Sequence, residues 1–255
     1  MRIGMMSDLH GHMPEIPPDL DLLIVAGDIC PDLFGGVPAS VDPDRQLRWW
    51  SHKWLPYVQK SNARKILVTW GNHDFCGQGA VIPAGRVEVV VDRLVEFEGL
   101  KIWMSPWSNT FMNWAFMKDP YELREVYAQI PEGVDILVSH QPPMGCGDIY
   151  FQFDTKRWDN IGSRELRERV YDLKPQLVVC GHLHKGYGKY LVGDTRVWNV
   201  SVVDEKYELV NPVSVIELER HDEKGTDVAE HEMGQGRFGY SPSGGWKWPV
   251  GTESQ

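Results

Sequence analysis

The chain contains 255 residues, of which 42% are hydrophobic, and it carries a formal net charge of -10 from 36 acidic and 26 basic side chains. This length suits one large domain or two small ones with a substantial core, and the acidic balance argues against a nucleic-acid partner bound through a broad basic face. The four cysteines include no C-x-x-C pair and indicate no disulfide framework, so we expect reduced thiols in a cytoplasmic protein.

The sequence predicts no targeting segment and no membrane segment. The apolar run within residues 1–6 is too short for a signal peptide. No later run approaches the ~18–20 apolar residues that span a bilayer. We therefore expect an unexported protein without a membrane partner.

Taken in chain order, short apolar runs predict five buried strands, at residues 2–6, 21–26, 66–68, 134–138 and 176–180. Helical spacing of apolar residues predicts three helices, over residues 43–62, 121–129 and 164–174. In the first helix, Asp42 or Asp44 is the expected N-cap, and Pro56 is expected to kink or end the helix.

The remaining segments predict further strands. Residues 87–90, 94–97 and 101–104 alternate in polarity, which favours antiparallel strands with Glu98 and Gly99 as the turn between the last two. Later strands are expected at residues 187–192, 195–200 and 213–219. The prediction is an α/β domain over residues 1–220. A polar tail follows at residues 221–255, rich in Gly, Pro and Ser, which we expect to form loop, disorder or a surface strap.

Each of the five apolar strands ends in side chains that can bind metal. These side chains are Asp8 and His10, then Asp28, Asn72, His140, and finally His182 and His184. In sheets with crossover helices, loops converge at the carboxyl ends of the strands, so all seven side chains could meet at one place. Any one of them has an ordinary structural alternative, such as a cap, a turn or a core histidine. Their recurrence at five strand ends favours a shared site.

The ligand types indicate which metals would bind. Carboxylates, imidazoles and one amide oxygen suit Mn, Fe, Co or Zn better than Ca²⁺ or a thiolate zinc site. Seven ligands are too many for one ion and suit two ions that share a carboxylate. Two such ions, ~3.5–4 Å apart, would lower the pKa of a bridging water and neutralise charge on a phosphoryl group. Beside Asn72, the imidazole of His73 and the carboxylate of Asp74 could move a proton.

This ordered set of motifs resembles the calcineurin-like metallophosphoesterase superfamily over residues 3–219. The motifs are Asp8-Leu9-His10, Gly27-Asp28, Gly71-Asn72-His73-Asp74, Ser139-His140 and Gly181-His182-Leu183-His184. The chain is more closely similar to the metallophosphoesterase-domain-containing subgroup, which resembles class III cyclic-nucleotide phosphodiesterases, in segments such as His140-Gln141-Pro142-Pro143 and Asn199-Val200-Ser201-Val202. The resemblance implies a four-layer α/β/β/α sandwich of two mixed sheets flanked by helices.

The resemblance also implies a role for each motif residue. The first ion would take Asp8, His10, Asp28 and His184, and the second would take Asp28, Asn72, His140 and His182, with Asp28 bridging. Asn72 and His73 would contact the substrate, and His73 would stabilise the phosphate or protonate the leaving group while Asp74 orients it. His73 would bind no metal. For His12, a contact with substrate phosphate and an exposed turn position are equal alternatives.

Two departures from the wider superfamily narrow the function. The segment Ile29-Cys30-Pro31 lacks the Asp-Arg-Gly of protein serine/threonine phosphatases, and Pro31 replaces the metal-binding Tyr of purple acid phosphatases. The leading hypothesis is a metallophosphoesterase acting on phosphodiester bonds of small substrates, including cyclic nucleotides, by in-line attack of a metal-bound hydroxide. Two alternatives stay open: a phosphomonoesterase of small phosphorylated metabolites, and a weakly active metal-binding scaffold. Trp107, Phe111 and Trp114 are either a platform for a nucleobase or packing residues.

Overall fold

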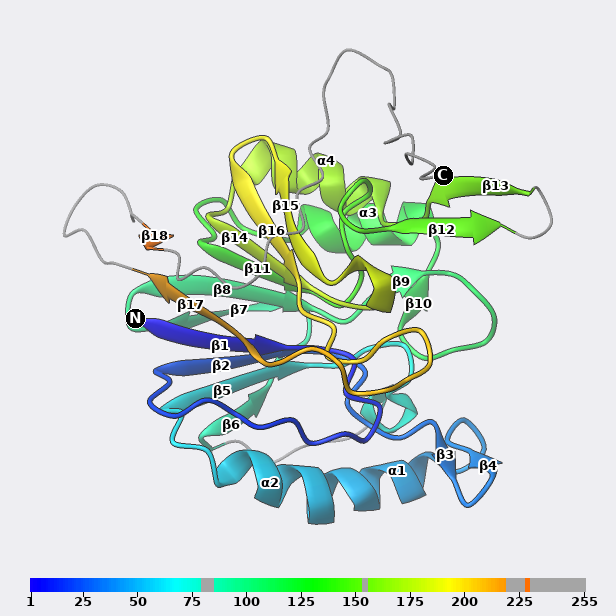
Figure 1. Cartoon of the computed structure of the whole chain (residues 1–255). Helices are drawn as coiled ribbons and strands as arrows, with labels where there is room; N and C mark the ends of the chain where they lie inside the picture. Colours follow the sequence, from blue (N-terminus) through cyan, green and yellow to red (C-terminus); the bar gives the residue numbers. More distant parts are fainter. Residues whose placement is uncertain (79–84, 153–155, 219–227, 230–255) are drawn as a thin grey trace, which may run out of the picture.

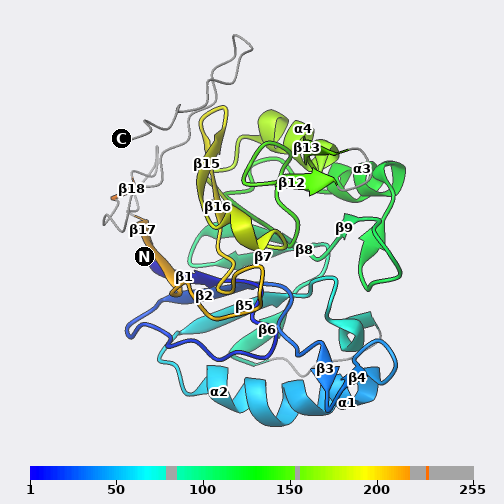
Figure 2. The same cartoon turned by 45° about the vertical axis from the view of Figure 1, so that its right-hand side comes forward.

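The computed structural model describes residues 1–78, 85–152, 156–218 and 228–229, and these form four layers (Figure 1). Two six-stranded sheets face one another, and a pair of helices covers the outer face of each sheet. The same order of layers is visible after a rotation of the molecule (Figure 2). The expected α/β/β/α sandwich is confirmed.

The first sheet contains the amino-terminal strands and has the order β18-β17-β1-β2-β5-β6. Its parallel strands are β1 (Arg2–Met6), β2 (Leu22–Ala26), β5 (Lys65–Thr69) and β6 (Val87–Val89). At the other edge, β17 (Ser214–Leu218) and β18 (Val228–Ala229) run antiparallel. The position of β6 differs from the expected antiparallel arrangement, because β6 pairs with β5 and the chain then crosses to the other sheet. Alternating polarity predicts the strand but not the sheet that it joins.

The second sheet has the order β15-β16-β14-β11-β8-β7. Its parallel centre consists of β8 (Leu100–Ser105), β11 (Ile136–Ser139), β14 (Leu177–Cys180) and β16 (Thr195–Asn199). Antiparallel hairpins add the edge strands β7 (Arg93–Phe97) and β15 (Gly188–Val192). Glu98 and Gly99 form the predicted turn between β7 and β8, both with positive φ, as hairpin turns of two residues require.

Helices α1 (Pro43–Trp49) and α2 (Leu55–Gln59) are joined by a π-helical turn, Trp50–Trp54, and together they cover the first sheet. Asp42 caps this helix through its side chain. The helix does not end at Pro56, because Pro56 lies in the first turn of α2, directly after the wider π turn, where a missing N–H costs little. Helices α3 (Pro120–Ala128) and α4 (Arg164–Leu173) cover the second sheet, as predicted.

Alternation along the strands divides the core into three parts. In β2, Leu22 and Ile24 face the second sheet, whereas Leu23 and Val25 face the α1–α2 helix. A third cluster, which includes Leu137 of β11, packs against α3 and α4. Burial on both faces explains why the central strands are continuous apolar runs, and it leaves their carboxyl ends as the place for polar side chains.

Several short elements were not predicted. They are β3 (Leu33–Phe34), β4 (Val37–Pro38), β9 (Ser108–Asn109), β10 (Met117–Lys118), β12 (Ile149–Gln152), β13 (Arg157–Asn160) and two 3-10 turns, Phe75–Gln78 and His184–Gly186. Apart from β18, the polar tail at 221–255 lies outside the described residues. Among the described residues, no helix is long and apolar enough to cross a membrane.

Candidate metal centre

The seven predicted ligand residues all lie just beyond the carboxyl ends of parallel strands. They follow β1 (Asp8, His10), β2 (Asp28), β5 (Asn72), β11 (His140) and β14 (His182, His184). The strands β1, β2, β5 and β8 point to the same side of the molecule (Figure 1). The side chains therefore meet across the two sheets, and four of the residues, Asp8, Asp28, Asn72 and His140, are at most 1% exposed.

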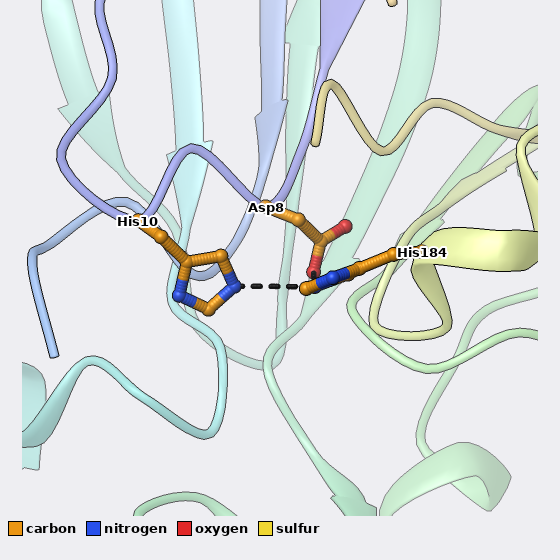
Figure 3. A group of neighbouring side chains, drawn as sticks. All are labelled: Asp8, His10 and His184. Atoms are coloured by element: carbon orange, nitrogen blue, oxygen red, sulfur yellow. Dashed lines mark hydrogen bonds and ion pairs between the residues drawn. The ribbon is translucent and has the colours of Figure 1, made fainter. Parts of the chain in front are cut away.

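The first group consists of Asp8, His10 and His184, which offer ligand atoms within 4.8 Å of one another (Figure 3). Nε2 of His184 lies 3.5 Å from Oδ1 of Asp8 and 3.2 Å from Nε2 of His10. Residues separated by more than 170 positions are thus brought together, because Asp8 and His10 follow the first strand and His184 follows the fourteenth.

The second group consists of Asp28, His140 and His182, again within 4.8 Å. Oδ2 of Asp28 lies 3.2 Å from Nε2 of His140 and 3.8 Å from Nε2 of His10. Oδ1 of Asn72 lies 2.9 Å from the same Nε2 of His140. The Asp28 carboxylate therefore lies between the two groups, which is the place that a bridging ligand would occupy.

Two of the imidazoles are oriented by backbone carbonyls. Nδ1 of His184 donates to the carbonyl of Asp204 at 2.9 Å, and Nδ1 of His140 donates to the carbonyl of Ala26 at 2.8 Å. Because a carbonyl oxygen can only accept, a neutral ring in this position carries its lone pair on Nε2. Metal-binding histidines are commonly oriented in this way.

These Nε2 atoms face other electron-pair donors rather than hydrogen-bond donors. Nε2 of His184 faces Nε2 of His10, and Nε2 of His140 faces Oδ1 of Asn72 and Oδ2 of Asp28. Such a cluster of lone pairs is unfavourable unless a proton or a cation lies among them. The mixed nitrogen and oxygen donor set fits divalent ions such as Mn, Fe, Co or Zn.

The charges of these groups are shifted by burial and by one another. Burial opposes protonation of His140, but the charge and hydrogen bond of Asp28, together with the charge of Asp8, outweigh it and raise the His140 pKa to about 9. For His182, burial and the neighbouring His140 act together and lower the pKa to about 3. Burial alone would raise the pKa of Asp8, but the hydrogen bond and charge of His184 hold that pKa well below its usual range. The carboxylates are therefore ionised and attract positive charge.

The backbone around the ligands is strained. Four ligand residues other than glycine have positive φ: Asp8 (56°), His10 (42°), Asp28 (51°) and His182 (67°). Such residues are uncommon and cost of order 1–3 kcal/mol each when they are held in sparsely populated regions. Strain that is concentrated at one set of strand ends is typical of a functional site.

Glycines before the ligands allow neighbouring strands to approach closely. A Cβ on Gly71 would lie 2.3 Å from Oδ1 of Asp28, and a Cβ on Gly27 would lie 2.5 Å from Nδ1 of His140. A Cβ on Gly181 would lie 2.1 Å from Oγ of Ser7 and 2.2 Å from Oδ2 of Asp8. Each glycine thus leaves room for a ligand that comes from another strand.

The change Gly181→Ala should therefore damage the centre by steric contact alone. We expect a loss of about 1–3 kcal/mol in the free energy of unfolding, as for other overpacked sites, and weaker metal binding because Asp8 is displaced. Chemical denaturation and isothermal titration with Mn²⁺ measure the two effects. Gly85→Ala is the matched control, since its Cβ would meet nothing within 4 Å. Equal behaviour of the two variants would contradict the steric account.

His73 lies at the edge of the centre and packs against Trp114 at 4.5 Å between ring centroids. Its backbone N–H donates to Oδ1 of Asp28 at 2.7 Å, which fixes the turn beside the second group. Its Nδ1 lies 2.8 Å from Oδ1 of Asp32, whose other oxygen lies 3.1 Å from Nδ1 of His10. Burial opposes protonation of His73, but Asp28 and Asp32 outweigh it and raise the His73 pKa to about 9.

The contacts of Asp74 differ from the expectation that it orients His73. Its buried carboxylate accepts hydrogen bonds from the backbone N–H groups of Ile29, Cys30 and Gly71, at 2.9 to 3.2 Å. Asp74 thus ties the loop after Asp28 to its own turn. The carboxylate that contacts the His73 ring is Asp32, which the sequence interpretation did not identify.

Two buried residues, Asn199 and Ser201, contact the candidate ligands or the residues next to them, and the sequence interpretation assigned no role to either. Oγ of Ser201 donates to Oδ2 of Asp8 at 2.6 Å, and Oδ1 of Asn199 accepts from the backbone N–H of Ser201 at 3.1 Å. The amide nitrogen of Asn199 donates to the carbonyls of Gly181 and Leu183, on either side of His182. Polar residues at alternate positions where a buried strand ends were the signal that could have identified them.

The other candidate residues have different surroundings. Nε2 of His12 contacts the carbonyl of Tyr207 at 2.9 Å, and the Tyr207 ring packs against the rings of His10 and His184. Trp107 donates to Asp92 and packs against the core, which agrees with the packing alternative. Phe111 is 58% exposed and contacts Trp114. The four cysteines are free and buried.

Comparisons with known proteins agree with this geometry. The family described as "Calcineurin-like phosphoesterase" matches residues 1–186, which contain all seven candidate ligands. The chain is similar to metallophosphoesterase domain-containing protein 1 of Homo sapiens and of Mus musculus, with 39% identity over 247 residues, 85% of this chain and 71% of each relative. It is also similar to UPF0046 protein C25E10.12 of Caenorhabditis elegans, with 31% identity, 81% of this chain and 76% of the relative.

Proposed function

The chain belongs to the calcineurin-like phosphoesterase family, and from this membership we propose that it is a metal-dependent hydrolase of small phosphodiesters, including cyclic nucleotides. The observation that carries the proposal is the position of the Asp28 carboxylate between His10 of the first group of candidate ligands and His140 of the second. The first group is Asp8, His10 and His184, and the second is Asp28, His140 and His182, with Asn72 beside His140.

In the proposed enzyme these residues would hold two divalent ions, with Asp28 within reach of both groups. Bound ions would supply Lewis acidity, lowering the pKa of a water and neutralising charge on the phosphoryl oxygens. Manganese, iron, zinc and cobalt all suit the donor set, and manganese is the first to test. Four free, buried thiols support the proposed cytoplasmic location.

The proposed proton donor is His73. Its Nδ1 contacts Asp32 and its ring packs against Trp114, which leaves Nε2 as the ring atom available to the leaving oxygen of a bound ester. The same nitrogen could instead bind a phosphate oxygen, and the two roles differ in how the rate depends on the leaving group. Asn72 lies directly before His73 and is the other proposed substrate contact. His12 is a third, further from the two groups.

The preference for diesters rests on the likeness to class III cyclic-nucleotide phosphodiesterases. The net charge of -10 supports a small substrate rather than an extended nucleic acid. A substrate panel tests this preference on manganese-loaded protein, with bis(p-nitrophenyl) phosphate, p-nitrophenyl phosphate and cyclic nucleotides assayed side by side. We expect a higher kcat/KM for the diesters. Faster hydrolysis of the monoester would favour the phosphomonoesterase, and bound metal without any turnover would favour the scaffold.

A further inference from the structure

The hairpin formed by β12 and β13 exposes aromatic side chains next to the metal centre. Within the described part of the chain its strands pair only with each other, and Phe151 lies opposite Trp158, with ring centroids 5.2 Å apart. Ile149 and Tyr150 are each 47% exposed, and Trp158 is 55% exposed. Removing these apolar side chains from water would be favourable. They nonetheless stay exposed, because the hairpin projects beyond the sandwich (Figure 1).

This hairpin forms one wall of a cavity of about 430 Å³, here called the hairpin cavity. Its lining residues are Ile149, Tyr150, Phe151, Trp158, Lys185 and Glu205. Nζ of Lys185 lies 5.5 Å from the centroid of the Trp158 ring and 3.7 Å from Oε1 of Glu205. An exposed ion pair of this kind contributes little stability, so both charged groups can turn towards a ligand.

The opposite wall of the cavity is formed by residues that directly follow residues of the metal centre in the chain. Lys185 directly follows His184, and Glu205 directly follows Asp204, whose carbonyl orients the His184 ring. The base of the hairpin also rests on this segment, because a Cβ on Gly186 would lie 2.0 Å from the carbonyl oxygen of Gly147. A molecule in the hairpin cavity would therefore sit beside the first group of candidate ligands.

The hairpin is held in this position by a buried carboxylate. Oδ1 of Asp148 accepts from the N–H of Gly145, and Oδ2 accepts from the N–H of Gly162, each at 2.9 Å. These two glycines stand on either side of the hairpin, and Asp148 is 1% exposed. These two hydrogen bonds fix the position of the hairpin, and therefore of its aromatic side chains, as a binding surface requires.

We propose that the hairpin cavity binds the planar aromatic group of a phosphoester whose phosphate lies at the metal centre, with a nucleobase as the occupant. This proposal rests on the proposed function, and it assigns the group that the phosphoester carries. The ring would stack on Trp158, while Lys185 donates to ring acceptors and Glu205 accepts from an exocyclic amine. A purely aliphatic ester would offer these two charged groups no hydrogen-bonding partner beyond the ion pair that they form with each other.

Binding of two ligands that differ only in the base tests the proposal. AMP and ribose 5-phosphate are titrated into manganese-loaded protein by isothermal calorimetry. We expect AMP to bind at least ~10-fold more tightly, as stacking of one base provides. In Trp158→Ala this preference should be lost while the affinity for ribose 5-phosphate is unchanged, and Trp158→Phe should retain most of it.

Tyr171→Ala is the matched control, since Tyr171 is a 62% exposed aromatic residue on α4, and its preference for AMP should equal that of the wild type. Equal binding of the two ligands, or an unchanged preference in Trp158→Ala, would overturn the proposal. The proposal would also be overturned if Phe111→Ala lost the preference for AMP and Trp158→Ala kept it, because the base would then bind beside Phe111 and Trp114, near His73. A second copy of the chain is the alternative occupant of the hairpin cavity. If sedimentation shows that the wild type self-associates and that Trp158→Ala does not, with an unchanged affinity for AMP, the proposal is overturned.

The failures of the two proposals can be told apart in the same proteins. A preference for AMP that depends on Trp158, in protein that hydrolyses no phosphoester, would support the subsite and contradict the catalytic function. Hydrolysis of bis(p-nitrophenyl) phosphate without any preference for AMP would contradict the subsite alone. Circular dichroism checks that the hairpin variants remain folded, as expected for an exposed side chain outside the core.

Discussion

Asp28→Ala is expected to reduce the bound metal to at most one ion per chain and to lower kcat/KM by on the order of 10³-fold or more. The physical reason is that Oδ2 of Asp28 faces both His140 and His10, at 3.2 and 3.8 Å. Without this carboxylate the two groups share no ligand, and the imidazoles lose the negative charge that stabilises a cation beside them. Metal analysis of dialysed protein and steady-state kinetics measure the two losses.

A second carboxylate deletion serves as the control for Asp28→Ala. Asp172 lies exposed on α4, one of the two helices that cover the outer face of the second sheet. Asp172→Ala changes the net charge by the same amount and should keep both ions and full turnover. An Asp28→Ala protein that is folded, holds two ions and turns over at the wild-type rate would refute the bridging role.

His73→Asn is expected to keep both ions and to lower kcat by about 10²–10⁴-fold on esters with poor leaving groups. The loss should be much smaller for p-nitrophenyl esters, because p-nitrophenolate leaves without needing a proton. Comparing a p-nitrophenyl diester with an alkyl diester therefore separates the two suggested roles of His73. An equal loss on both substrates would indicate that His73 binds phosphate, and a loss of metal would show that it is a ligand.

Two neighbouring carboxylates make this comparison sharper. Asp32 contacts the His73 ring, so Asp32→Asn, assayed at saturating metal, should show the same dependence on leaving group with a smaller loss of about 10–100-fold. The carboxylate of Asp74 accepts from the backbone N–H groups of Ile29, Cys30 and Gly71, so Asp74→Asn should lower stability without that dependence. The reverse result would restore the original expectation that Asp74 orients His73.

The buried parts of the fold and the ligand positions are the features that the sequence predicts well. Central strands such as β2 are covered on both faces and appear as continuous apolar runs. The chain must leave the sheet where the run ends, so Asp28 follows a strand end in the sequence as well as in space. The proximity of the candidate ligands is predictable because this geometry converts strand order into proximity.

Residues on loops are less predictable, because spacing along the chain does not determine the path of a loop. Asp32 lies four residues after Asp28, and it reaches His73 only because the loop turns back over the centre. The direction of the Asp74 side chain is decided by the backbone N–H groups that need an acceptor. The β12–β13 hairpin did leave a signal, since its aromatic residues favour strands.

The most direct test counts metal and turnover in one sample. The chain is stripped with a chelator and titrated with Mn²⁺, while bound manganese is measured by mass spectrometry and hydrolysis of bis(p-nitrophenyl) phosphate is followed at each step. The centre described here predicts two bound ions per chain at saturation, with hydrolysis that rises as the second ion binds. Saturation at a single ion, or two bound ions without hydrolysis for manganese, iron, zinc and cobalt alike, would contradict it.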